Sequence, residues 1–254
     1  FLGPMPLGRV LYKMALPATI GMFVNALYNF VDTIFIGRGV GPLGIGGLTI
    51  VLPFQMMIFA LALLIGAGAS SIVSRALGAG EEEKAAKAAG NAGFMAVTLG
   101  MILLAAVYIF KDQVLILFGA TEEILPFADE YLSTIMFGVV FITFTVSMNN
   151  VIRAEGSSGF AMITMLIGAL SNIILDAVFI FGLDMGIRGA ALATVIGRFL
   201  SFLFVIYYFS SSKARIKPFL YMFKPKLKLM RSIFSLGTPN FVRQVGASVL
   251  AVLV

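Results

Sequence analysis

The chain has 254 residues, of which 60% are hydrophobic and 12% charged, with a mean hydropathy of +1.03 and a formal net charge of +6. Soluble globular domains carry about a quarter charged residues, so this composition excludes that class and indicates a membrane protein. Cysteine and histidine are both absent, which excludes disulfides, thiol catalysis and imidazole proton transfer. Any proton transfer must therefore use carboxylates, tyrosines or lysines.

Six long apolar segments and the beginning of a seventh follow one another along the chain. They cover roughly residues 10–36, 45–74, 88–110, 125–152, 161–183 and 189–212, with the seventh opening near residue 230. Clusters of glycine, proline and charged residues separate them, as is typical of helix ends. The alternating ten-residue runs of a membrane β-barrel are missing. We therefore expect an all-α fold, a polytopic transmembrane helical bundle.

Lysine and arginine predict the orientation of the bundle, because they are enriched on the cytoplasmic side. With the N-terminus in the cytoplasm, only Arg38, Lys111 and Arg188 fall outside, and Arg198 and Arg243 fall within the membrane without an assigned role. The others fall inside: Arg9, Lys13, Arg75, Lys84, Lys87, Arg153, Lys213, Arg215, Lys217, Lys224, Lys226, Lys228 and Arg231. The basic run 213–231 is then a cytoplasmic loop close to anionic headgroups, and we expect no nucleic-acid partner.

A weak internal repeat predicts how the chain is divided. LGRVLYKMALP (7–17) and LMRSIFSLGTP (229–239) share Leu, Arg and Pro at matching positions. We expect a six-helix lobe over 1–212, a basic inter-lobe loop over 213–228, and the first part of helix seven, which opens a second lobe, over 229–254. Because the chain starts with Phe and stops inside an apolar run, we also expect it to be a fragment that lacks most of the second lobe.

Two carboxylates lie inside the apolar segments. Asp176 is the one charge between Ala161 and Leu183, and Asp32 lies five residues before Gly37 at the end of the first segment. A carboxylate within the bilayer costs roughly 2.5–3.5 kcal/mol on insertion scales, so an intramembrane aspartate indicates an ion or proton site.

Other polar residues are expected at the same depth. Helix rise places Asp32 roughly 8 Å, Asp176 roughly 10 Å and Thr194 roughly 8 Å below the outer face. Asn172 precedes Asp176 by one turn, and Tyr28 precedes Asp32 by one turn. Taken singly, Asn172 and Thr194 fit interhelical hydrogen bonds equally well.

Two kinds of chemistry fit this set, and the sequence leaves both open. Desolvated carboxylates can exchange protons. Alternatively, Asp176, Asn172 and Thr194 offer hard oxygen ligands to a metal cation such as Na⁺. Pro17 removes a backbone hydrogen bond early in the first helix and should bend it, as a static kink or as a hinge. No nucleophile and base occur together, so we expect no enzyme.

The segments 15–41 (ALPATIGMFVNALYNFVDTIFIGRGVG) and 171–197 (SNIILDAVFIFGLDMGIRGAALATVIG) resemble the MATE family of multidrug and toxin extrusion transporters, in its prokaryotic DinF-like branch. The shared motifs are Pro-x14-Asp in helix one, Asn-x3-Asp in helix five and GAALAT in helix six. The resemblance implies a twelve-helix, two-lobed antiporter that exports organic, often cationic, compounds in exchange for H⁺ or Na⁺ and uses no other cofactor. It also implies a cation site at Asp32, Asn172, Asp176 and Thr194, with Tyr28 beside it and Pro17 at the helix-one bend.

We therefore predict a cation-coupled exporter in the plasma membrane of a prokaryote, with small organic substrates, the lipid bilayer and the second lobe as its partners. One alternative is a flippase for lipid-linked oligosaccharides in the same superfamily, which should show several cationic residues in its cavity. A membrane scaffold is the other alternative, and it would leave the buried aspartates without a purpose.

Overall fold

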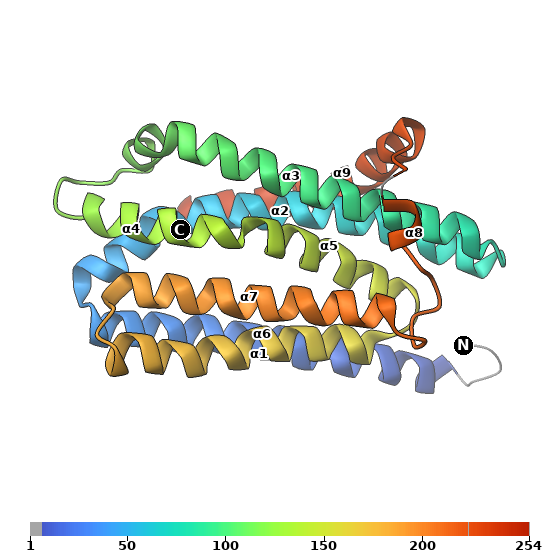
Figure 1. The fold of residues 1–254 in the computed structure, drawn as a ribbon, viewed down its shortest axis with the longest axis horizontal. Coiled ribbons are helices and arrows are strands. Elements are labelled where there is room, and N and C mark those ends of the chain that lie inside the picture. The colour runs from blue at the N-terminus through green and yellow to red at the C-terminus, as the bar shows by residue number, and fades with distance from the viewer. Residues whose placement is uncertain (1–6, 223, 254) are drawn as a thin grey trace.

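The computed structural model describes residues 7–222 and 224–253, and its helices are joined by short turns (Figure 1). The expected helical bundle is confirmed, because six helical segments are long and apolar enough to cross a membrane. The helices are α1 (Leu7–Gly39), α2 (Pro42–Gly78), α3 (Glu82–Leu117), α4 (Leu125–Ile135), η1 (Met136–Gly138), α5 (Val139–Ala154), α6 (Ser158–Asp176), η2 (Ala177–Gly182), α7 (Gly186–Ser210), α8 (Phe219–Met222) and α9 (Leu227–Leu253).

The long helices run side by side in two layers (Figure 1). In one layer α6 packs against both α1 and α7, and in the other α2 packs against α3, α5 and α9. By contrast, α1 and α2 touch little although they are consecutive. The connections α1–α2, α3–α4 and η2–α7 lie at one end of the bundle, and α2–α3, α5–α6 and the segment after α7 lie at the other. The second end is the one that the positive charges predict to be cytoplasmic.

Three helices differ from the expected segments in detail. The third segment was expected to end at 110, where Phe110 does leave helical geometry (φ −114°, ψ 18°), but α3 continues beyond it to Leu117. The fourth segment is interrupted by the 3₁₀ turn η1 between α4 and α5. The short helix α8 lies within the predicted inter-lobe loop. Residues 1–6 of the predicted first lobe, the side chains of Arg9 and Lys13, and Val254 lie outside the described residues.

Helix α9, the predicted seventh membrane helix, lies along α2 (Figure 1). Two glycines allow the backbones to touch. A Cβ atom on Gly68 would lie 1.9 Å from the Ile233 carbonyl oxygen, and a Cβ atom on Gly237 would lie 1.9 Å from the Leu64 carbonyl oxygen. Only glycine fits at such a distance, as is usual where membrane helices approach closely. Arg243, expected within the membrane, lies on an exposed part of α9.

The segment between α7 and α9 is fastened to the rest of the chain at several points. Glu155, at the end of α5, accepts hydrogen bonds from the Tyr208 hydroxyl (3.3 Å) and from the Arg215 backbone N–H (3.0 Å). The Arg215 guanidinium also pairs with Glu82 at 2.7 Å. Farther along, the Lys226 backbone N–H donates to Asn91 Oδ1 at 2.7 Å. The segment is therefore held by α3, α5 and α7 together.

Protonation of Glu155 is expected to make stability depend on pH. Glu155 is 7% exposed, and burial raises its pKa from 4.5 to about 7. The folded protein then binds this proton more tightly than the unfolded chain does. The resulting stability is present below about pH 4.5 and is lost as the pH rises through about 7, with an expected magnitude of about 3 kcal/mol.

This expectation is checked by the thermal unfolding midpoint of the detergent-purified protein between pH 5 and pH 8. The wild-type midpoint should fall more steeply over this range than that of Glu155→Gln, which keeps an acceptor oxygen but has no proton to lose. Glu123→Gln, at an exposed position in the α3–α4 turn, is the matched control and should follow the wild type. Parallel curves for the wild type and Glu155→Gln would refute the role given to this carboxyl.

Candidate functional site

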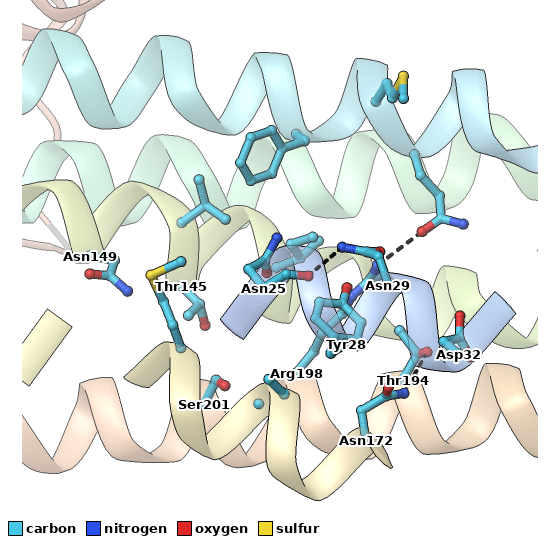
Figure 2. Close-up of a pocket in the computed structure, with 18 of the residues that line it drawn as sticks. Asn25, Tyr28, Asn29, Asp32, Thr145, Asn149, Asn172, Thr194, Arg198 and Ser201 are labelled. Atoms are coloured by element: carbon cyan, nitrogen blue, oxygen red, sulfur yellow. Dashed lines mark hydrogen bonds between the residues drawn. The ribbon is translucent and has the colours of Figure 1, made fainter. Parts of the chain in front are cut away.

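The four residues of the predicted cation site, Asp32, Asn172, Asp176 and Thr194, lie together between α1, α6 and α7. Figure 2 shows three of them, Asp32, Asn172 and Thr194. All four are buried: Asp32 is 6% exposed, Asn172 2%, Asp176 0% and Thr194 7%. The Asn172 amide joins two of the others in the orientation that satisfies both of its ends, donating to Asp176 Oδ2 at 3.1 Å and accepting from the Thr194 hydroxyl at 3.1 Å. The structure thus brings these side chains together, and their role as a cation site stays a prediction.

Small residues set this arrangement by letting α6 and α7 approach each other. A Cβ atom on Gly197 would lie 2.8 Å from the Gly168 carbonyl oxygen, and one on Gly168 would lie 2.6 Å from Ser201 Oγ. Asn172 lies one turn after Gly168, and Thr194 lies nearly one turn before Gly197. The contact between the two helices therefore places the amide of Asn172 within reach of the Thr194 hydroxyl.

Asp32 and Asp176 face each other between α1 and α6, and their carboxyl groups lie within hydrogen-bonding range. A carboxyl donates a hydrogen bond only when it is protonated, so this contact requires a proton between the two groups or a cation in its place. Oδ1 of each carboxyl receives no hydrogen bond from the described residues. The pair therefore leaves oxygen atoms that a proton or a small cation would satisfy.

A π-helical segment follows Asp176 directly. In η2 the Leu183 N–H donates to the Val178 carbonyl at 2.9 Å, a bond that spans five residues. π-helical turns are rare and occur frequently at functional sites. The segment contacts the outer part of α1, where the rings of Phe181 and Phe35 pack edge to face with centroids 5.4 Å apart. It thus holds the helices that carry Asp32 and Asp176 together.

A cavity of about 580 Å³ adjoins the carboxyl pair (Figure 2). Asp32, Asn172 and Thr194 line it, whereas the fully buried Asp176 lies behind them and does not. The wall formed by α2 is mostly apolar, and the walls formed by α1 and α7 are mostly polar. The α2 wall consists of Leu48, Leu52, Gln55, Met56, Phe59 and Leu63. The cavity therefore offers both apolar surface and hydrogen-bonding groups, as small-molecule sites do.

The other predicted site residues have different surroundings. Tyr28 lines the cavity one turn from Asp32, beside Asn25 and Asn29 (Figure 2). Pro17 lies inside α1, which is helical across it from Leu7 to Gly39, and the predicted bend stays a prediction. Within the described residues, no three or more Asp, Glu, His or Cys side chains gather as metal ligands. A sodium site would therefore depend on the amide and hydroxyl oxygens of Asn172 and Thr194.

Sequence reasoning missed several residues of the cavity. Arg198, to which it gave no role, lines the cavity and donates to Gln55 Oε1 at 3.0 Å. Tyr131 from α4 and Arg153 from the last turn of α5 also line it. Gln55 could have been noticed as a polar residue within a long apolar segment. Helix rise gives the depth of a residue but does not say which helices face each other. The pairing of Gln55 with Arg198 therefore left no signal in the sequence.

Comparison with known proteins decides the family. The family model MatE matches residues 17–178, which is more than half of the chain. The chain belongs to the MatE family. The resemblance that the sequence motifs carry is thereby confirmed, and the assignment to the DinF-like branch stays a prediction.

Two further comparisons place the MatE chain among relatives. It is 29% identical over 240 residues to the multidrug export protein MepA of Staphylococcus aureus (strain MSSA476), covering 94% of this chain and 53% of MepA. A structure of a multidrug resistance MATE family transporter in an outward-facing conformation matches 94% of this chain and 53% of its own length, with 30% identity and a TM-score of 0.87. A structure of MATE in complex with MaL6 matches with a TM-score of 0.89 at 30% identity, over 94% of this chain and 53% of its own. The chain thus spans about half the length of these proteins.

Proposed function

We propose that this chain forms the cation-coupling part of an antiporter that exports small organic compounds in exchange for H⁺ or Na⁺. The observation that carries the proposal is the contact between the Asp32 and Asp176 carboxyl groups inside a membrane-embedded bundle. Buried acids in membrane spans mark ion and proton pathways because an ionised group there is costly. The relatives' description as multidrug export proteins supports the same class of activity.

Coupling would arise because Asp32 belongs both to the proposed cation site and to the cavity wall. Asp32 contacts Asp176 on one side and lines the cavity on the other. Proton or sodium binding at the pair neutralises charge at the cavity wall, so the affinity for a substrate with a positive group falls in that state. A difference in affinity between states is what lets one ligand drive the other.

The shape of the cavity supports organic compounds as substrates. Its volume of about 580 Å³ lies within the range of drug-sized sites. Met56 and Phe59 on the α2 wall and Met165 on α6 provide adaptable apolar contacts. The proposal places the protein in the plasma membrane of a prokaryote with its N-terminus in the cytoplasm, working together with a second lobe.

The flippase alternative requires a cluster of cationic side chains for pyrophosphate. Two arginines do line the cavity, namely Arg198 at the middle of α7 and Arg153 in the last turn of α5. Their positions along the helices separate them by roughly half the length of a membrane-spanning helix. Arg243 is not among the lining residues. An exporter of single organic molecules therefore accounts for the cavity better than a flippase does.

Transport by the protein expressed from its natural gene and reconstituted in liposomes tests the proposal. Flux of the dye rhodamine 123 is measured under an imposed pH gradient and, separately, under an imposed sodium gradient. One of the two gradients is expected to accelerate flux by about tenfold or more over no gradient. Equal flux under all three conditions would refute coupling, and no flux above empty liposomes would refute transport.

A further inference from the structure

Arg198 is a membrane-embedded cation whose hydrogen-bonding partners are neutral, while the Asp32 carboxylate acts on it electrostatically without direct contact. It lies at the middle of α7, is partly exposed and lines the cavity. Its guanidinium donates to Gln55 Oε1 at 3.0 Å and lies within hydrogen-bonding range of the Tyr28 hydroxyl. Among the described residues, no carboxylate oxygen lies within 4.0 Å of its nitrogen atoms. A charge in this position is costly and calls for a counter-charge.

The surroundings of Arg198 are arranged so that its guanidinium stays at the cavity. A Cβ atom on Gly138 would lie 3.5 Å from Arg198 Cδ, an ordinary van der Waals distance, so the Arg198 side chain packs along the turn η1. Gln55 in turn lies within hydrogen-bonding range of the Tyr131 hydroxyl, which orients its amide toward Arg198. Figure 2 shows that Arg198, from α7, lies close to Tyr28 and Asn29, from α1. Since a guanidinium carries five N–H donors, several remain for a ligand.

The charges that line the cavity also favour an anionic group. Asp32 is the one carboxylate among the described lining residues, whereas Arg153 and Arg198 both line it. Asp32 is already engaged with Asp176, which lies behind the wall. Arg153 has the neutral Asn150 Oδ1 as its partner at 3.3 Å. The lining therefore carries two arginines and one carboxylate, and Arg198 is the arginine at the middle of its membrane helix.

We propose that Arg198 binds the carboxylate of a zwitterionic organic compound, whose positive group is left for Asp32, and so makes the cavity bind carboxylate-bearing compounds more tightly than their esters. This inference rests on the proposed function, because it names the class of compound that the exporter would carry. A planar guanidinium matches a carboxylate in a two-point contact, and such charge-assisted bonds are about twice as strong as neutral ones. The apolar side chains of the α2 wall would hold the hydrocarbon part of the same molecule.

The test uses two dyes that differ by one methyl ester. Rhodamine 110 has a free carboxylate, and rhodamine 123 is its methyl ester. Fluorescence anisotropy measures the binding of each to the purified protein expressed from its natural gene. Arg198→Gln is expected to weaken rhodamine 110 binding by about tenfold or more, whereas binding of the cationic rhodamine 123 should stay or become tighter, because this dye has no carboxylate and a like charge has been removed. Arg198→Lys should weaken rhodamine 110 binding less, because it keeps the charge.

The controls separate this inference from the proposed function. Arg188→Gln removes an exposed arginine from the first turns of the same helix and should leave both dyes unaffected. Retained rhodamine 123 binding shows that a variant is folded. An equal loss of affinity for both dyes in Arg198→Gln, or an unchanged affinity for rhodamine 110, would overturn the carboxylate site. Binding of rhodamine 123 to the wild type would still support the proposed exporter in that case. Failure of both dyes to bind the wild type would overturn both proposals.

Discussion

Replacing Asp32 and Asp176 together by asparagine is expected to reduce gradient-driven flux by about tenfold or more, to the rate seen without a gradient. Asparagine keeps the size of the side chain and removes the group that binds the cation. Each single variant should also lose most of the coupling, because the two carboxyls contact each other and act as one site. The measurement is rhodamine 123 flux in liposomes under the gradient that drives the wild type.

A matched control and a second readout distinguish lost coupling from lost folding. Asp184→Asn changes an exposed aspartate in the turn after η2, and asparagine tolerates the positive φ of 52° found there. This variant should transport like the wild type. The double variant should still exchange rhodamine 123 between the two sides at equal concentration, because that exchange needs no cation. Gradient-driven flux at the wild-type rate in the double variant would remove the basis of the coupling mechanism.

The second large effect is expected at the contact between α2 and α9. Gly68→Ala or Gly237→Ala would place a methyl group 1.9 Å from a backbone carbonyl oxygen of the other helix. A backbone atom cannot move aside as a side-chain end can, so the helices must separate. We expect each substitution to destabilise the protein by about 2 to 3 kcal/mol, seen as a lower thermal unfolding midpoint.

Gly78→Ala is the matched control for this second prediction. Gly78 ends α2, and a Cβ atom there would have no atom within 4 Å. Because alanine favours helix over glycine by up to about 1 kcal/mol, this variant should be as stable as the wild type or slightly more so. The three alanine variants together test packing rather than the loss of glycine as such. Unchanged midpoints for Gly68→Ala and Gly237→Ala would show that α9 does not pack on α2 in this way.

The grouping of the carboxyls with Asn172 and Thr194 could be predicted from the sequence. Charged side chains stand out in apolar segments, and helix rise converts distance along the chain into depth. The burial of Asp176 behind the cavity wall could not be predicted in the same way, because depth does not say which way a side chain points. The sequence therefore placed Asp176 in the right layer but did not separate it from the residues that line the cavity.

The other features that could not be predicted depend on which helices lie next to each other in the bundle. The pairing of Arg198 with Gln55 depends on α2 and α7 facing each other across the cavity, and no periodicity within one helix encodes such a contact. The π-helical turn after Asp176 likewise left no signal in the sequence, because AVFIFG contains apolar residues that are common in any membrane helix. The boundaries of the spans, by contrast, followed from the Gly and Pro clusters and agree with the observed helices to within a few residues at most ends.

The bonds made by Glu155, Arg215 and Lys226 determine what kind of linker leads into α9. A basic loop without such bonds would behave as a flexible linker, whose average end-to-end distance grows as the square root of its length. Here the segment is tied at intervals to α3, α5 and α7, so little free length remains to absorb motion. A shift of α9 would therefore be transmitted to α3, α5 and α7, because the segment connects them rigidly.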